Sequence, residues 1–207
     1  MKPRFFRHQT RAWTLIELLV VIAVLAILAA MIDWGPTSNE RRKAERVCCM
    51  NNLKQVDAAC QLWANNNQGK FPMAVSSNAV LCFQLISNEL FTPRILFCPS
   101  DKNSSAATNF STAFSAKKIS YFVGLDAKSS NTPVWLAGDC NFTIGNDQVI
   151  SGLFEVASNA PIAWTSARHR FAGNIGLADG SVRMLNNSNF VDCLRHTSLA
   201  TNRLAIP

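Results

Sequence analysis

The sequence predicts an α+β protein in which N-terminal helices pack on a small antiparallel β-sheet. Three observations support this class. An apolar run, interrupted by a charge only at Glu17, extends from Trp13 to Ile32; a second helical pattern covers residues 38–64, and strand-like segments follow residue 118. Because the helices come first and the strands follow as a group, the order favours α+β over a parallel α/β sheet.

The apolar run is long enough to cross a membrane as a helix. Twenty residues at about 1.5 Å per residue span about 30 Å, the thickness of a bilayer core. Four basic residues precede the run and supply much of the net charge of +7. We expect a cytoplasmic leader at 1–12, a transmembrane helix at 13–34 and an exported head at 35–207. The head shows no basic patch with interleaved aromatic residues, so nucleic acid is not an expected partner.

Glu17 carries the single charge between Trp13 and Ile32. A carboxylate at membrane depth costs roughly 2.5–3.5 kcal/mol at the centre of a helix, and less near the interface. Glu17 is therefore expected either to lie at the interface or to have a positively charged partner.

A break or kink is expected near Gly35-Pro36, because proline removes a backbone donor and disfavours helix in the residue before it. Thr37 and Glu40 then fit a capping box that starts the amphipathic helix 38–64. Apolar residues recur there every three or four positions, which predicts one buried stripe. The stripe consists of Val47, Met50, Leu53, Val56, Ala59 and Trp63. Turn-forming residues at 65–72 end the helix.

A short helix is expected within residues 78–93, and a polar exposed loop at 101–118. Strands are expected within residues 119–125, 133–139, 148–156, 174–178 and 181–185. Asp179-Gly180 separates the last two of these and predicts a hairpin turn, since both residue types tolerate positive φ. Alternation of Ile175 and Leu177 with Val182 and Met184 predicts one buried face for this hairpin.

The N-terminal segment RAWTLIELLVVIAVLAILA resembles the type IV prepilin signature, which pilins share with the pseudopilins of bacterial type II secretion. The resemblance implies a pilin-like fold and cleavage by a prepilin peptidase between Ala12 and Trp13. It also implies N-methylation of Trp13, and it places Glu17 at the fifth mature position, where the family has glutamate. Ala12 and Trp13 replace the family's usual glycine and phenylalanine.

This resemblance suggests a partner for Glu17. Cleavage creates an ammonium group at Trp13, and opposite charges in an apolar environment reduce each other's burial cost. The partner amine belongs either to the same helix or, as the family implies, to a neighbouring subunit. The implied partners are the prepilin peptidase, an inner-membrane assembly platform and sibling subunits. The implied location is the inner membrane, with the head in the periplasm or on the surface of a filament.

The segment RHRFAGNIGLADGSVRML resembles the prepilin-type processing-associated H-x9-DG region of bacterial families, through His169, Asp179 and Gly180. Residues 51–72 and the LFCPSD segment at 96–101 support that resemblance. His169 is expected to hold the hairpin by a hydrogen bond to Asp179 or to a backbone carbonyl. The alternative, given less weight, is a metal bound with Asp179 or Asp139. We expect no resident metal or other cofactor.

The sequence favours no enzyme class. It lacks the G-x-S-x-G, H-E-x-x-H, phosphate-loop and dinucleotide-binding patterns. A nucleophilic arrangement of Cys140 or Cys98 with His169 is conceivable, but no local spacing supports it. The seven cysteines show no C-x-x-C spacing, and their pairing cannot be deduced from the sequence.

The sequence therefore predicts a structural pilin-like or pseudopilin-like subunit without catalytic residues. The rival interpretation is a membrane-anchored binding protein that does not polymerise. Glu17 and the cleavage site favour assembly, because a simple anchor needs neither.

Overall fold

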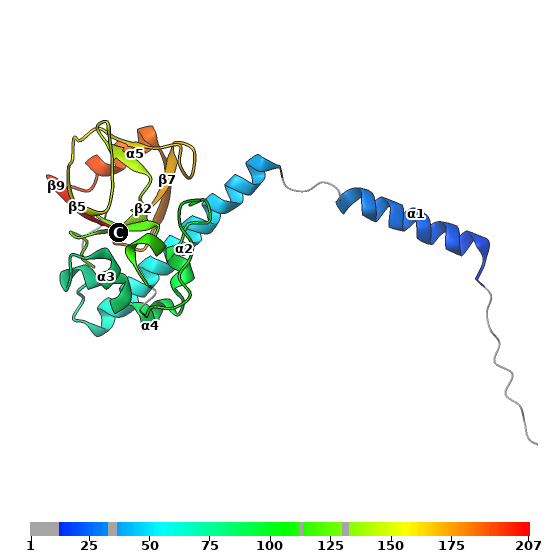
Figure 1. Ribbon diagram of the computed structural model, residues 1–207, viewed down its shortest axis with the longest axis horizontal. Helices are drawn as coiled ribbons and strands as arrows, with labels where there is room; N and C mark the ends of the chain where they lie inside the picture. Colours follow the sequence, from blue (N-terminus) through cyan, green and yellow to red (C-terminus); the bar gives the residue numbers. More distant parts are fainter. Residues whose placement is uncertain (1–12, 33–36, 112–113, 130–132) are drawn as a thin grey trace, which may run out of the picture. The chain divides into compact units, whose positions relative to one another are not determined.

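The computed structural model describes residues 13–32, 37–111, 114–129 and 133–207. The predicted leader at 1–12, including Ala12, and the predicted break near residue 35 lie outside these residues. The chain divides into two compact units, Met1–Glu40 and Arg41–Pro207. Figure 1 shows helix α1 in the first unit and the α+β head in the second.

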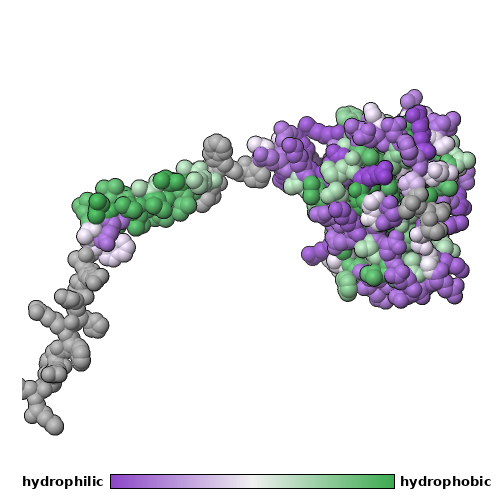
Figure 2. Space-filling model, turned by 180° about the vertical axis from the view of Figure 1, so that it is seen from behind, coloured by the Kyte–Doolittle hydropathy of each residue, from purple (hydrophilic) through white to green (hydrophobic). Residues whose placement is uncertain are grey.

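Helix α1 extends from Leu15 to Ile32. Its large apolar side chains, from Leu15 through Met31, are exposed, and the face seen in Figure 2 is apolar except at one end. The sequence predicted a transmembrane helix at 13–34. Among the helices described, however, none combines the length with the apolar character that crossing a bilayer requires.

Helix α2 extends from Ser38 to Asn66 and starts as predicted. The Thr37 amide donates to Glu40 Oε2 at 2.8 Å, which confirms the expected capping box. The predicted apolar stripe is correct at Leu53, Val56 and Ala59, which are buried, but wrong at Val47, which is 42% exposed. The buried face is displaced around the helix from the predicted one. It consists of Cys49, Leu53, Val56, Asp57, Ala59, Cys60 and Ala64.

The predicted helix within 78–93 is two short helices, α3 (Ala79–Leu85) and α4 (Ser87–Leu90). The Asn78 side chain caps α3 by accepting hydrogen bonds from the amides of Val80 and Leu81. Three 3-10 turns lie nearby, at Pro72–Ala74 (η1), Pro93–Leu96 (η2) and Ala116–Lys118 (η3). The expected polar loop at 101–118 is only partly exposed, since Asp101, Ala107 and Phe114 are buried.

The head contains a six-stranded antiparallel sheet in the order β5-β9-β1-β2-β7-β8. Its strands are β1 (Tyr121–Gly124), β2 (Trp135–Asp139), β5 (Gly152–Ala157), β7 (Ala172–Leu177), β8 (Val182–Asn186) and β9 (Thr201–Ile206). A smaller sheet in the order β4-β3-β6 joins β3 (Phe142–Ile144), β4 (Asp147–Gln148) and β6 (Ile162–Trp164). The expected antiparallel arrangement is thus confirmed, with more strands than predicted.

Alternate residues of the large sheet contribute to two hydrophobic cores. Tyr121 and Val123 of β1 pack with α2 residues such as Leu53, whereas Phe122 packs with Trp164 and other aromatic residues. This alternation follows from the two-residue period of a strand. Helix α5 (Asn187–Arg195) covers the second core, and Figure 1 shows α3 and α4 on the opposite side of the strands.

The predicted hairpin is confirmed, but its burial pattern is not. Strands β7 and β8 pair around a turn in which Gly180 has φ +82°, as the Asp-Gly pair predicted. All of β7 is buried, because the second core packs on one face and Asp57 of α2 lies against Gly176 on the other. Val182 is only partly buried and Met184 is 40% exposed, since β8 lies at the edge of the sheet.

Candidate functional site

Thr14 and Glu17 form a capping box at the start of α1. Glu17 Oε2 accepts hydrogen bonds from the Thr14 amide at 2.8 Å and from Thr14 Oγ1 at 2.7 Å. The Glu17 amide donates to Thr14 Oγ1 at 3.3 Å. These bonds satisfy backbone donors that the first turn of a helix leaves unpaired. The carboxylate that the sequence singled out thus has a local partner one residue away from Trp13.

A second candidate site lies inside the head. Cys49, Cys98, Asp139 and His169 are all buried, and one ligand atom from each lies within 4.8 Å of those from the others. The four residues come from distant parts of the chain. Cys49 lies on α2 and Asp139 ends β2, whereas Cys98 follows η2 and His169 precedes β7. We call these four residues the buried cluster.

The distances within the buried cluster are short. Cys49 Sγ lies 2.7 Å from Cys98 Sγ, and Cys98 Sγ lies 3.4 Å from His169 Nε2. His169 Nε2 lies 3.7 Å from Asp139 Oδ2. Asp139 Oδ2 also accepts hydrogen bonds from the backbone amide and the side-chain amide of Asn174, at 2.7 and 2.9 Å. Within the described parts of the chain, Asp139 Oδ1 is buried without a hydrogen-bond partner.

The electrostatics of the cluster favour a thiolate at Cys98. The Cys49 thiol donates to Cys98 and lowers the pKa of Cys98 to about 6 against the opposing effect of burial, and His169 adds to this lowering. The same hydrogen bond and burial raise the pKa of Cys49 above its ordinary range. Burial alone would lower the pKa of His169, but Cys98 and the charge of Asp139 outweigh it and raise that pKa. Burial raises the pKa of Asp139, against the positive charges of His169 and Arg168.

Neighbouring polar pairs hold the loops that carry Cys98 and His169. Ser100 Oγ donates to Glu45 Oε2 of α2 at 2.9 Å. Asp101 Oδ2 lies 2.6 Å from Arg168 Nη2, and the Arg168 side chain is largely buried. The residues next to the cluster thus link the Cys98 loop to α2 and to the His169 loop.

His169 and Asp179 occupy different places. Asp179 lies in the β7–β8 turn, where its Oδ1 accepts a hydrogen bond from the Ser181 amide at 2.9 Å. Neighbouring hydrogen bonds lower the pKa of Asp179. His169 instead faces Cys98 and Asp139. The structure therefore brings His169 to Asp139, the second of the two carboxylates that the sequence suggested.

The sequence identified three members of the cluster, but in separate hypotheses. It paired His169 with Asp139 for a metal, and Cys98 with His169 for catalysis. It missed Cys49, which lies four residues before Leu53 on the buried face of α2. Residues four apart on a helix share a face, so the spacing between Cys49 and the predicted core residue Leu53 could have indicated that Cys49 is buried.

Cys98 and Cys140, the two cysteines that the sequence suggested as nucleophiles, are poorly placed for that role. Cys98 is fully buried by the described residues, so its sulfur is shielded from solvent. Burial raises the pKa of Cys140 to about 12, which keeps that thiol protonated at neutral pH. All seven cysteines lie in described parts of the chain, and none of them forms a disulfide there.

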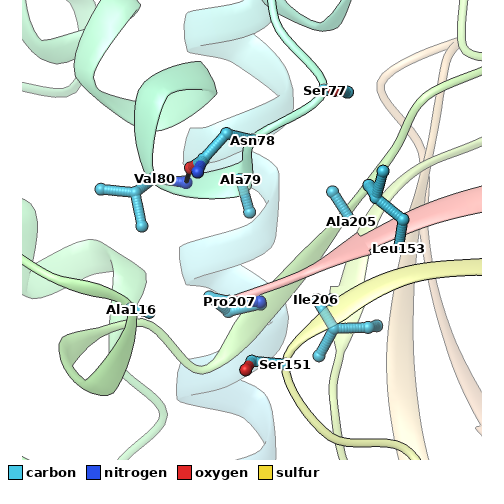
Figure 3. A pocket seen from close by; sticks show the side chains of 11 residues that line it. Ser77, Asn78, Ala79, Val80, Ala116, Ser151, Leu153, Ala205, Ile206 and Pro207 are labelled. Atoms are coloured by element: carbon cyan, nitrogen blue, oxygen red, sulfur yellow. Dashed lines mark hydrogen bonds between the residues drawn. The ribbon is translucent and has the colours of Figure 1, made fainter.

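An open pocket of about 350 Å³ lies elsewhere, between the start of α3 and the ends of β5 and β9. Small and apolar residues line it, including Ala79, Leu153 and Ile206. Figure 3 shows the Asn78 side chain turned to its own helix, where it caps α3. With no charged side chain in its lining, the pocket offers little to select a polar ligand.

Comparison with known proteins identifies the N-terminal segment. Residues 8–32 match the prokaryotic N-terminal methylation motif. No curated protein and no solved structure matches the chain. The chain therefore carries the signal of a type IV pilin-like prepilin at its N-terminus.

Proposed function

We propose that this chain is the precursor of a pilin-like structural subunit, which assembles into a type IV pilus or a type II secretion pseudopilus. The observation that carries this proposal is the match of residues 8–32 to the methylation motif. Under the proposal, a prepilin peptidase cleaves between Ala12 and Trp13 and methylates Trp13. The predicted transmembrane helix 13–34 inserts in the inner membrane with the leader in the cytoplasm, and the head lies in the periplasm or on the filament.

The capping box supports a role for Glu17 in assembly. Its carboxylate is 2.8 Å from the Thr14 amide, one residue from the nitrogen that cleavage would turn into an ammonium. A negative charge at a helix N-terminus is also favoured by the helix dipole. In the mature subunit, Glu17 would pair with the Trp13 amine of its own helix or of a sibling subunit. Processing would thus switch on an interaction that the precursor lacks.

The exposed apolar surface of α1 supports the same role. Large side chains such as Leu15, Ile16 and Met31 are at least 70% exposed. Such a surface needs lipid or protein to cover it. In the proposed pathway, lipid covers the helix first, and the helices of sibling subunits at an assembly platform cover it later. No catalytic residue is needed for this role.

Processing is tested by mass spectrometry of the mature N-terminus after co-expression with a prepilin peptidase. We expect an N-methylated Trp13. An intact Met1, or cleavage near Ala30 as in a secretory signal, would contradict the proposal.

Assembly is tested by two matched variants. Glu17→Gln keeps a hydrogen-bond acceptor for Thr14 but removes the charge, so we expect processing without filaments. Thr14→Ala removes the hydroxyl but keeps the charge, so we expect filaments to form. Electron microscopy of sheared material detects filaments, and immunoblots of the membrane fraction detect the processed subunit. Filaments from Glu17→Gln but not from Thr14→Ala would show that Glu17 only caps the helix.

The same experiment distinguishes a filament subunit from the rival function, a membrane-anchored binding protein. A membrane-anchored binding protein would remain in the membrane fraction in both variants, and its wild-type chain would form no filaments even with the assembly platform present.

A further inference from the structure

We propose that the buried cluster of Cys49, Cys98, Asp139 and His169 is a structural zinc site of the head. Two sulfur ligands, one imidazole nitrogen and one carboxylate oxygen form a donor set that Zn²⁺ accepts in tetrahedral geometry. The four donors converge although they come from four separate segments. This site is independent of residues 8–32 and of the proposed filament.

The distance between the Cys98 sulfur and the His169 nitrogen suits a small ion. With Zn–S of about 2.3 Å and Zn–N of about 2.0 Å, a tetrahedral ion separates sulfur from nitrogen by about 3.6 Å. Cys98 Sγ and His169 Nε2 are 3.4 Å apart. The two sulfurs, at 2.7 Å, would move apart to about 3.8 Å on binding. Binding would therefore require the two cysteine side chains to rotate about χ1.

An unpaired atom points to the same conclusion. Asp139 is completely buried, and its Oδ1 has no hydrogen-bond partner among the described residues. A buried carboxylate oxygen without a partner is costly, because it has lost its water and gained nothing in exchange. Asn174 holds the other oxygen through two hydrogen bonds and thereby fixes the carboxylate, as outer-sphere partners of metal ligands do.

The charges also balance around a dication. Two thiolates, one carboxylate and a neutral imidazole would give a zinc complex a net charge of minus one. Arg46 of α2 is partly buried and interacts electrostatically with Asp139. Its guanidinium donates to the Leu185 carbonyl at 3.2 Å, while its Nε is buried without a partner. Arg46 is thus placed to neutralise the remaining charge.

The site is closed, which favours a structural over a catalytic metal. Cys49, Cys98 and Asp139 are fully buried, and His169 is 9% exposed. A catalytic zinc keeps one position open for water or substrate, whereas a structural zinc has four protein ligands. A metal here would join α2, the Cys98 loop, β2 and the His169 loop in one crosslink.

The test measures zinc in the full chain, purified in detergent under reducing conditions without added metal. We expect about one zinc per chain by elemental mass spectrometry. Cys49→Ser, Cys98→Ser and His169→Gln should each lower the zinc content at least tenfold. Cys60→Ser and Cys82→Ser change buried cysteines of the same core that lie outside the cluster, so they should retain zinc.

Cobalt keeps the proposal testable if the variants fail to fold. The wild-type chain is depleted of metal with a chelator and titrated with Co²⁺. We expect visible absorption bands of tetrahedral cobalt and a sulfur-to-cobalt charge-transfer band, both lost on adding excess Zn²⁺. A folded chain that contains no zinc and gives no such bands would overturn the proposal. So would a Cys49–Cys98 disulfide, detected as a crosslinked peptide lighter by two hydrogens, in chain purified directly from cells.

Discussion

Asp57 is a buried carboxylic acid on the face of α2 that packs against the sheet. Both of its oxygens are buried, and no residue that the structure describes forms a hydrogen bond with them. Burial, together with the negative charge of Asp179, raises the pKa of Asp57 well above its ordinary value. The group is therefore protonated in the folded head at pH values where it is ionised in the unfolded chain.

This shift predicts a pH dependence of stability. The folded state retains a proton that the unfolded state releases above about pH 4, so the stability linked to Asp57 is complete below that pH. This contribution to the free energy of unfolding decreases as the pH rises towards the pKa of Asp57 in the folded state, by up to about 1.4 kcal/mol per pH unit. Asp57→Asn cannot titrate, so its free energy of unfolding should rise relative to wild type between pH 4 and pH 8.

Urea unfolding at several pH values measures this difference. Asp147→Asn removes an exposed carboxyl and serves as the control for the change in net charge. A constant difference between Asp57→Asn and wild type across the pH range would show that Asp57 is ionised in the folded head.

Helix α2 packs closely on β7 because Gly176 has no side chain. A Cβ at position 176 would lie 2.5 Å from Asp57 Oδ2. The Gln61 side chain adds a hydrogen bond to the Ala178 carbonyl at 2.7 Å, just beyond the end of β7. The contact between the helix and the sheet thus depends on a small residue facing a carboxyl group.

Gly176→Ala should destabilise the head by about 1–3 kcal/mol, because the added methyl group overlaps the Asp57 carboxyl. Asp57→Ala makes room for it, so the double variant should recover about 1 kcal/mol or more relative to additivity. Thermal unfolding of the four chains of this cycle gives the coupling energy. Strict additivity would mean that α2 and β7 are farther apart in solution.

Elements with a strong local signal were predictable from the sequence. The Thr37–Glu40 capping box and the Asp-Gly turn depend on neighbouring residues, and the structure has both. The core positions of α2 were predicted correctly only at Leu53, Val56 and Ala59. Strand β9 and helix α5 were missed. The segment TNRLAI has only a weak alternation, and its place between β5 and β1 is set by pairing with strands far away in the chain. Phe190 of α5 stacks on Trp164 with ring centroids 3.9 Å apart, a tertiary contact that no local pattern shows.

The buried cluster was only partly predictable, because its residues meet through contacts between distant segments of the chain. His169 and Asp139 were proposed together because their residue types suit a metal. Their meeting with Cys49 and Cys98 depends on the positions of α2 and of the loop after η2, which only the folded head provides.

At the scale of the whole head, strand β9 connects β5 to the rest of the large sheet. It pairs with β5 over six residues, from Thr201 to Ile206, and with β1 on its other edge. Leu204 and Ala205 are buried between the two neighbours. Without β9, strand β5 has no partner in that sheet.

Deletion of residues 201–207 should therefore abolish cooperative unfolding of the head, because β5 and β1 each lose a hydrogen-bonded neighbour. Arg203→Ala is the matched point change in the same strand. It removes only an exposed ion pair with Asp126 and should cost less than about 1 kcal/mol. Near-ultraviolet circular dichroism during heating distinguishes the two. A sharp transition in the deletion variant would show that the sheet is stable without β9.

The position of β9 also bears on when the head can fold. Every other described strand leaves the ribosome before β9, yet the sheet is complete only when β9 enters between β5 and β1. Such pairing between distant segments raises contact order and slows folding. A nascent chain of this topology therefore cannot complete the large sheet until residues 201–206 have been synthesised.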